Sequence, residues 1–356
     1  MKVKELIKYE EKSKIKAGEA VENGKYPFFT SSEAEDKRYN DYTCDTEGII
    51  MGTGGNATLH YCNGRFAVST DCLVLKTNDK VNCKYLFYFF KANMNILQAG
   101  FKGAGLKHTN KNYIENIEII RLPDINQQKH IVYKLEKVES IIKKQSGTID
   151  YFDTLIKARF VEMFGDVVKN TKNWKTKKLN ELCGFNNNKL GVDSIHNKVW
   201  LLNLDMIESD SGKIIDYYMI DEKEVPSSTI SFNENCVLYS KLRPYLNKVV
   251  TPIKSGYATS ELIAIETNSL INKYFLAFAL RSKSFVDMIN LTSYGAKMPR
   301  ASVDALKNFY IPVPDIEIQN TFATFVKEVD KLKFDVQKSL EKTQMLFDSL
   351  MQEYFN

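Results

Sequence analysis

The chain has 356 residues, a hydrophobic fraction of 44%, and 49 Lys and Arg against 44 Asp and Glu, giving a net charge of +5. This length is sufficient for two or three domains with buried cores, and the mild basic excess permits a polyanionic partner without indicating one. No apolar run reaches the roughly 18 residues of a membrane span, and no signal peptide is evident, so we expect a cytoplasmic protein.

Residues 1–121 are predicted to form a first domain dominated by strands. Residues 48–59 are apolar up to a glycine cluster and residues 65–77 have a strand-like composition, so the two stretches are predicted to pair as a hairpin with a wide turn. Residues 84–97 are expected to form a buried helix. Residues 100–110 follow as a basic loop that contains several glycines.

Residues 122–166 are predicted to form one long helix, about 60 Å long at 1.5 Å per residue. Its apolar residues recur at steps of three and four, which is typical of a coiled-coil seam. Gln145 and Arg159 interrupt the seam. The seam residues are Ile131, Leu135, Val138, Ile142, Ile149, Phe152, Ile156 and Met163.

Residues 167–312 repeat the plan of the first domain with different residues. Residues 235–250 correspond to the glycine hairpin of the first domain, and residues 273–289 correspond to its helix at 84–97. Between them, Ser260 and Glu261 match Thr70 and Asp71 of the first domain. The second domain is longer near its start, at residues 186–213.

Residues 313–356 repeat the long helix of residues 122–166 at a constant separation of 191 residues, so that Pro123 matches Pro314 and Gln128 matches Gln319. Because Gln145 and Arg159 correspond to apolar residues in the second copy, whereas Lys333 and Thr343 correspond to apolar residues in the first, we expect the helices to pair. Each polar seam residue is then expected to face the apolar part of a side chain on the other helix. The second seam comprises Phe322, Val326, Val329, Val336, Leu340, Phe347, Leu350 and Tyr354.

The sequence predicts no catalytic or metal site. It lacks the Pro-Pro pair of adenine methyltransferases and a Walker A loop. Glu35, Asp36 and Lys37 have the E-x-K order of many metal-dependent nucleases, but no acidic partner precedes them on a strand, so a solvated turn is favoured. The histidines do not cluster as metal ligands would; they are His60, His108, His130 and His196.

The alternation of domains and long helices, the PD-x(3)-Q start of each helix and the RFVEMFGD end of the first resemble the specificity subunit of type I restriction-modification systems. GKYPFFTSS, SKLRPYLNKV and GAKMPRAS also resemble segments of its target-recognition domains. The resemblance implies an α+β fold in which mixed α/β target-recognition domains (1–121 and 167–312) alternate with two long helices conserved in that family (122–166 and 313–356). The helices are expected to pair as an antiparallel coiled coil, giving a pseudo-twofold tandem repeat.

The same resemblance implies that each domain reads one half of a bipartite sequence in double-stranded DNA. The helices are then a spacer and a docking surface for two methyltransferase subunits, and a translocating nuclease subunit joins the complex. This chain would hold no cofactor, because S-adenosylmethionine is expected in the methyltransferase.

Candidate DNA-binding residues lie in loops, since base edges are read by donors and acceptors aimed into the grooves. Arg243 lies beside Pro244, where a guanidinium can contact guanine through two hydrogen bonds, or it forms a structural pair with Glu261. Thr53, Asn56 and Arg65 are expected around the glycine hairpin. The candidates are Thr53, Asn56, Arg65, Lys102, Lys107, His108, Lys241, Arg243, Tyr245, Lys248, Lys297 and Arg300.

Two other functions remain compatible with the sequence. A coiled-coil assembly protein whose domains bind other proteins would show no salt-sensitive affinity for DNA. The recognition part of another restriction-modification class is the second alternative, and the missing catalytic motifs count against it.

Overall fold

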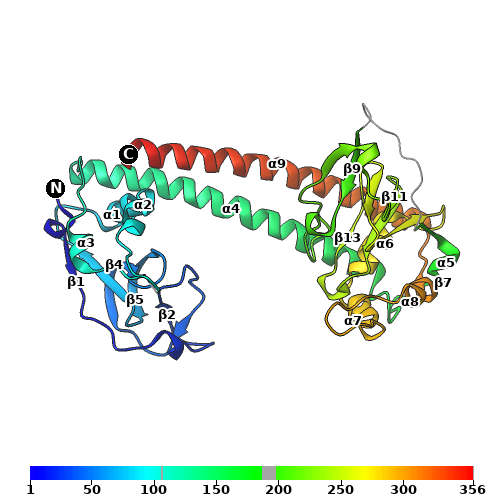
Figure 1. Ribbon diagram of the computed structural model, residues 1–356, viewed down its shortest axis with the longest axis horizontal. Coiled ribbons are helices and arrows are strands. Elements are labelled where there is room, and N and C mark those ends of the chain that lie inside the picture. Colours follow the sequence, from blue (N-terminus) through cyan, green and yellow to red (C-terminus); the bar gives the residue numbers. More distant parts are fainter. Residues whose placement is uncertain (106, 187–197, 356) are drawn as a thin grey trace. The chain divides into compact units, whose positions relative to one another are not determined.

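The computed structural model describes residues 1–105, 107–186 and 198–355. The chain divides into unit 1, Met1–Ser146 with Lys338–Asn356, and unit 2, Gly147–Gln337. Each unit therefore joins one domain to a segment of both long helices, α4 (Ile125–Phe164) and α9 (Ile316–Phe355) (Figure 1). Part of the predicted insertion, residues 187–197 with His196, lies outside the described residues.

The domain of unit 1 is built on a six-stranded sheet with the order β1-β6-β4-β5-β2-β3. Neighbouring strands are antiparallel except β2 and β5, which are parallel. The strands are β1 (Ile7–Tyr9), β2 (Tyr26–Phe29), β3 (Arg38–Tyr39), β4 (Cys44–Gly52), β5 (Leu59–Val68) and β6 (Cys72–Thr77). The short helices are η1 (Val3–Glu5), η2 (Ala17–Glu19), α1 (Cys83–Ala92), α2 (Met94–Ala99) and α3 (Lys111–Glu115).

The domain of unit 2 has two four-stranded sheets, with the orders β10-β9-β14-β11 and β13-β12-β15-β8, and a β16-β7 pair, within the described residues. Its strands are β7 (Thr176–Lys178), β8 (Cys183–Asn186), β9 (Lys198–Leu202), β10 (Tyr218–Asp221), β11 (Thr229–Phe232), β12 (Cys236–Ser240), β13 (Val249–Val250), β14 (Gly256–Thr259), β15 (Leu262–Thr267) and β16 (Tyr310–Pro312). Its helices are α5 (Leu179–Leu182), η3 (Leu204–Met206), η4 (Glu222–Glu224), η5 (Pro244–Leu246), α6 (Lys273–Arg281), α7 (Lys283–Leu291) and α8 (Val303–Asn308).

The two domains share one strand topology. The sheet β8-β15-β12-β13 corresponds to β1-β6-β4-β5, and the sheet β11-β14-β9-β10 corresponds to β4-β5-β2-β3, so that β4 and β5 have a counterpart in each sheet of unit 2. The strand equivalent to β4 is divided into β11 and β12 by a turn at Asn233, whose side chain accepts a hydrogen bond from the amide of Asn235 (2.9 Å). Asparagine favours such turns because its side chain bonds to the backbone two residues on. The repeat inferred from the sequence is thus present in the fold.

The predicted pairing of residues 48–59 with residues 65–77 is confirmed in part. Residues 49–52 of β4 pair antiparallel with residues 72–75 of β6, but the strand that follows the glycine turn is β5, so the two predicted stretches are not joined as one hairpin. The turn of the hairpin is residues 53–58, between β4 and β5, and residues 65–77 belong partly to β5 and partly to β6. β4 pairs with both strands. The helices predicted at 84–97 and 273–289 are each divided in two, since Asn93 ends α1 and the Ser282 hydroxyl caps α7.

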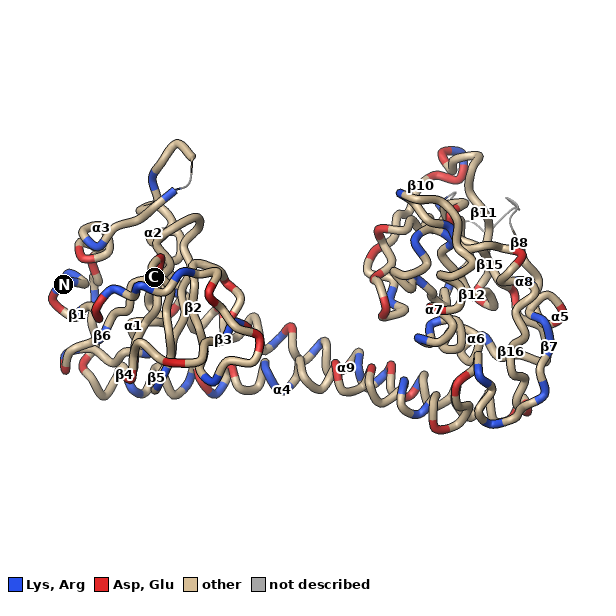
Figure 2. Tube along the Cα trace, turned by 90° about the horizontal axis from the view of Figure 1, so that it is seen from below, with Lys and Arg blue, Asp and Glu red and all other residues tan. Residues whose placement is uncertain are grey.

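The long helices pack on each other in antiparallel orientation within each unit, as predicted. In unit 1, Gln145 Nε2 donates to Ser339 Oγ (2.8 Å), and Lys134 Nζ, earlier in α4, donates to Tyr354 Oη, later in α9 (3.4 Å). Charged residues of both signs follow the two helices (Figure 2). No helix of the described residues is both long and apolar enough to cross a membrane.

In unit 2, Asp153 forms an ion pair with Lys333, and the ring of Phe164 lies 5.4 Å from that of Phe322. The expectation that polar seam residues face apolar stems was therefore wrong for Gln145 and Lys333, which each find a polar partner. A buried polar group needs a hydrogen-bond partner, and an apolar stem supplies none.

The predicted seam residues are shared between the helix pair and the domain cores. Those buried are Leu135, Val138, Ile149, Ile156, Phe322, Val326, Val329 and Phe347. Those partly buried are Ile131, Ile142, Phe152, Met163, Val336, Leu340, Leu350 and Tyr354. Each domain is consequently packed onto its own helix segments.

A buried glutamine joins each long helix to its domain. Gln128 is fully buried; its Oε1 accepts from the amide of Asn82, the residue that caps α1 (2.7 Å), and its Nε2 donates to the carbonyls of Lys80 (3.2 Å) and Pro123 (2.8 Å). The PD-x(3)-Q motif is therefore a structural junction.

Gln319 makes the same contacts in unit 2. It accepts from the amide of Asn272, which caps α6 (2.8 Å), and donates to the carbonyls of Leu270 (3.1 Å) and Pro314 (2.7 Å). The carboxamide is suited to this position because it carries both an acceptor and two donors. The three hydrogen bonds fix the start of each long helix against its domain.

We predict that Gln128→Leu destabilises unit 1 by about 1–3 kcal/mol, because it leaves buried backbone groups without partners. The matched control is Gln127→Leu, since Gln127 is the exposed neighbour and its substitution should change stability by less than about 0.5 kcal/mol. Denaturant unfolding followed by hydrogen exchange separates the two units. Equal stability of both variants would contradict the junction role.

Candidate nucleic-acid interface

Two loops of unit 1 lie side by side at the end of β4. They are the turn at residues 53–58 and the loop at residues 100–110. A bridge between Gly54 and His108 joins the two loops, and a bridge between Lys102 and His108 closes the second loop on itself. Three backbone hydrogen bonds hold the turn: Thr53 N to Asp71 O (2.8 Å), Gly55 N to Lys107 O (2.9 Å) and Thr109 N to Thr53 O (3.1 Å).

Unit 2 repeats this arrangement with other residues. Leu242 and Tyr294 form the equivalent bridges with Arg300. The three matching hydrogen bonds are Lys241 N to Glu261 O (2.9 Å), Arg243 N to Pro299 O (2.7 Å) and Ala301 N to Lys241 O (2.9 Å). The predicted recurrence of the loops is therefore present in the backbone, and it makes Arg243 the equivalent of Gly55 and Arg300 that of His108.

Arg243 occupies a backbone conformation that suits glycine better. Its φ is +48°, and Gly55 at the equivalent position has a φ of +84°. A left-handed conformation costs a non-glycine residue about 1–3 kcal/mol and persists only where the surroundings fix it. Such residues cluster at functional sites. An arginine in this strained conformation, with its side chain exposed, is a candidate for direct contact with a ligand.

The side chains presented by the paired loops are mostly polar or basic. In unit 1, Asn56, Lys102 and Lys107 are exposed and make no side-chain hydrogen bond or ion pair within the described residues. His108 is exposed beside them. In unit 2 the exposed polar or basic side chains of the loops include Arg243, Tyr245 and Lys297, next to the half-buried Lys241, and Tyr294 and Met298 are exposed beside them.

Arg300 is held by Glu261 rather than free. Its Nε and Nη2 donate to the two carboxylate oxygens at 3.1 and 2.6 Å. These hydrogen bonds lower the pKa of Glu261, so the carboxylate is ionised at neutral pH. The structural pair that we considered for Arg243 thus belongs to Arg300, and Arg243 has no such partner in the described part of the chain.

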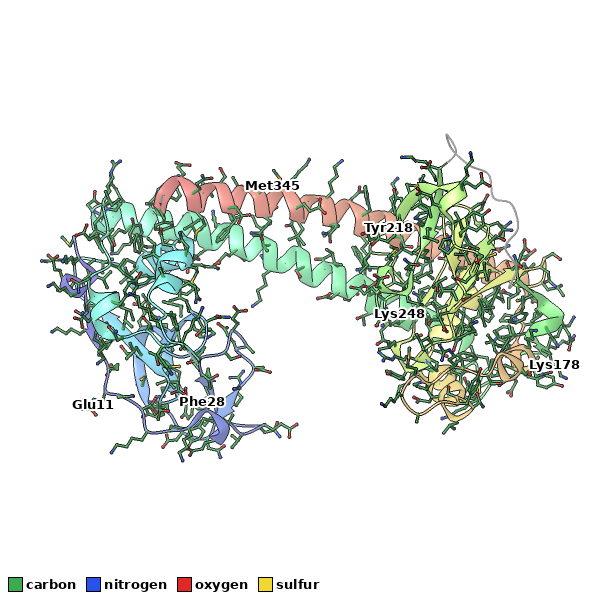
Figure 3. All side chains as sticks on the ribbon, in the orientation of Figure 1. Glu11, Phe28, Lys178, Tyr218, Lys248 and Met345 are labelled. Atoms are coloured by element: carbon green, nitrogen blue, oxygen red, sulfur yellow. The ribbon has the colours of Figure 1, made fainter. Side chains whose placement is uncertain are left out.

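Three further candidates have structural contacts. Lys248, labelled in Figure 3, donates from Nζ to the carbonyl of Leu204 (2.7 Å), and the Thr53 hydroxyl donates to the carbonyl of Asp71 (3.0 Å). Arg65 was predicted to lie around the glycine turn, which was wrong.

Arg65 lies at the opposite end of the β4–β5 hairpin, where it pairs across the strands with Asp45 (2.9 Å). Its guanidinium stacks on the ring of Tyr42, 4.9 Å from the ring centre. Because β5 begins at Leu59, before the strand start that the sequence predicts at residue 65, Arg65 lies along the strand and away from the turn.

Asp71 and Glu261 were matched in the sequence, but no part in holding the loops was predicted for either residue. Both receive the amide hydrogen bond that anchors the first loop of the pair. Glu35 was expected on a solvated turn, and its side chain is exposed outside the strands, while one carboxylate oxygen lies 2.9 Å from Nδ1 of the buried His60. Residues 35 and 60 are brought together only by the folding of the strands, so the sequence alone does not predict this contact.

Comparison with known proteins identifies relatives over the whole chain. Residues 1–150 and 171–344 match the family model of the type I restriction modification DNA specificity domain. The type I restriction enzyme EcoDI specificity subunit of Escherichia coli is 23% identical, over 99% of this chain and 86% of the relative. The type I restriction enzyme MjaVIII specificity subunit of Methanocaldococcus jannaschii is 21% identical, over 80% of this chain and 72% of the relative.

Solved structures share the fold. The type I restriction-modification S subunit from M. genitalium matches with a TM-score of 0.68 and 14% identity, over 100% of this chain and 95% of the other. A chain from a structure that concerns complex assembly and conformational transition of the type I R-M system matches with a TM-score of 0.54 and 14% identity. The match covers 93% of this chain and 91% of the other.

We predict that Arg243→Gly blurs recognition in one half-site only and costs about 1–3 kcal/mol of specific binding there, the value of a bidentate base contact. Stability should stay within about 1 kcal/mol of wild type, because glycine relieves the strained φ while making the unfolded chain more flexible. The measurement is DNA binding to matched and mismatched sites, with Lys297→Ala as the comparison. Equal weakening on random DNA would assign Arg243 to phosphates alone.

Proposed function

The chain belongs to the type I restriction-modification DNA specificity family and is a DNA specificity subunit; on this premise we propose that its two domains each read one half of a bipartite target. The observation that carries the proposal is the paired-loop arrangement present in both units, with the same backbone hydrogen bonds and different exposed side chains. Two similar frames with different side chains are what two unlike half-sites require.

The chemistry of the exposed side chains supports this assignment. Asn56 offers the donor and acceptor that adenine requires, and Arg243 offers the two donors that guanine requires. Lys102, Lys107 and Lys297 are suited to phosphates, which fix the protein on the duplex without reading sequence. The functions of a protein-binding assembly protein or of another restriction-modification class do not account for family membership over the whole chain.

The long helices are proposed to dock two methyltransferase subunits, which would bind S-adenosylmethionine. Each unit exposes large apolar side chains on both of its helix segments, although charged residues predominate there. They are Tyr133, Ile141, Met345 and Leu346 in unit 1, and Tyr151, Val161, Leu332 and Phe334 in unit 2. Ile141 and Leu332 occupy the same position of the repeat, as expected for two equivalent docking surfaces.

The first test is reconstitution. We expect the purified chain to transfer no methyl groups from S-adenosylmethionine to DNA, because it lacks the Pro-Pro motif of adenine methyltransferases. Co-expression with its methyltransferase should yield methylated DNA whose sequencing shows two short half-sites at a fixed separation. Methylation by the chain alone, or a single continuous motif, would overturn the proposal.

The second test addresses docking. We predict that Phe334→Ser and Met345→Ser, which alter exposed residues of α9, each remove one methyltransferase from the complex while leaving folding unchanged (Figure 3). Ile253→Ser is the matched control, since Ile253 is exposed but lies outside the long helices. The stoichiometry is read by native mass spectrometry. Two bound subunits in the double variant would contradict these docking surfaces.

A further inference from the structure

A half-open cavity of about 490 Å³ lies in unit 2 beside the loop that carries Arg243. Its walls come from α4, α6, α7 and the segment around η5, and include Lys157, Phe160, Tyr245, Phe278, Arg281 and Val286. Small-molecule sites usually have volumes of about 300–1,000 Å³ and combine apolar walls with a few polar groups. The cavity has this composition, and of the candidate DNA-binding residues only Tyr245 lines it.

Arg281 is the unusual group in this cavity. Its guanidinium stacks on the ring of Phe278, 4.1 Å from the centre, and Nη1 donates to the carbonyl of Ser211 (2.9 Å). Gly212, with a φ of +72°, makes room for it, because a Cβ there would lie 1.4 Å from Nη1. The backbone is thus shaped around this one side chain.

The charge of Arg281 is incompletely balanced by the protein. Burial lowers the pKa of its guanidinium to about 10, while Asp330 and Asp153 act in the opposite direction from a distance. Arg281 forms no ion pair with a described residue, and Asp153 is already paired with Lys333. Arg281 is half-buried by its accessible surface, and a cation that is partly removed from water is stabilised by an anion that contacts it directly.

Two carboxylates, Asp210 and Asp287, line the cavity, and one of them is paired with a cation while the other is hydrogen-bonded to a neutral amide. Asp210 accepts a hydrogen bond from Asn247 Nδ2 (3.0 Å), and Asp287 pairs with Lys283 (3.1 Å). Lys157, exposed on α4, has no partner in the parts of the chain that the structure describes. Two cations, Arg281 and Lys157, therefore remain available to a negatively charged ligand.

We propose that this cavity is a nucleotide-binding site in which Arg281 and Lys157 hold the phosphate and the exposed ring of Tyr245 stacks on the base. A guanidinium binds phosphate oxygens through paired hydrogen bonds, and aromatic rings accept any base by stacking. Because Tyr245 belongs to the loop of Arg243, an occupied site stabilises that loop. The nucleotide comes either from the free pool or from the bound DNA strand.

The first experiment titrates the full-length chain with deoxyadenosine 5′-monophosphate by calorimetry, with deoxyadenosine as the phosphate-free comparison. Removing one charged hydrogen-bonding partner should weaken binding about 10- to 150-fold. This loss is expected for Arg281→Met and for Lys157→Gln. Lys254→Gln removes an exposed charge that does not line the cavity and should leave binding unchanged. Because Lys157 is exposed, Lys157→Gln tests the site even if Arg281→Met fails to fold.

The second experiment distinguishes the two sources of the nucleotide. If the free monophosphate does not bind, affinity for double-stranded DNA is compared between Lys157→Gln and Lys254→Gln at fixed salt. A selective loss in Lys157→Gln assigns the phosphate to DNA. Equal behaviour of the two variants toward both probes overturns the proposal, and it does so without affecting the reading of half-sites, because methylation mapping of the same variants reports that function separately.

Discussion

The organisation of this protein depends on two buried carboxamides. Gln128 and Gln319 each bind the backbone amide of the asparagine that caps a domain helix, α1 or α6, and two carbonyls at the junction with a long helix. A buried carboxamide has one acceptor and two donors, so its hydrogen bonds fix both the distance and the orientation between the start of the long helix and the domain. Each domain is thereby set on its long helix at a defined angle, and the packing of the domain core onto that helix follows from it.

The loops proposed to read DNA are held by the backbone rather than by their side chains. The same three amide hydrogen bonds recur in both units although the residues that make them differ, Gly55 in one and Arg243 in the other. Backbone hydrogen bonds form whatever side chain a residue carries. The exposed side chains of the loops can therefore differ without changing the loop conformation. This division between a fixed frame and variable side chains explains how domains of low mutual similarity can share one topology.

The sequence predicted the parts of the structure that repeat or have a strong period. The separation of 191 residues revealed the duplication, and the apolar seam revealed the paired helices. The sequence failed where local signals compete: a glycine cluster marks a turn but not which strands it joins, and Asn93 and Ser282 end helices through caps that a continuous apolar pattern conceals. The contacts of Arg65 and Lys248 could not be predicted from the sequence, because their partners, Asp45 and the carbonyl of Leu204, are brought close only by folding.

Unit 1 is assembled from two separated parts of the chain, with consequences for its synthesis. Phe347, Met351 and Phe355 belong to the same apolar core as Tyr85 and Leu135. Unit 2, in contrast, is continuous from Gly147 to Gln337. A ribosome therefore completes unit 2 before it delivers the last core residues of unit 1. During that interval the nascent first domain leaves part of its apolar surface uncovered, so it is the half of the molecule most exposed to aggregation and most in need of chaperones.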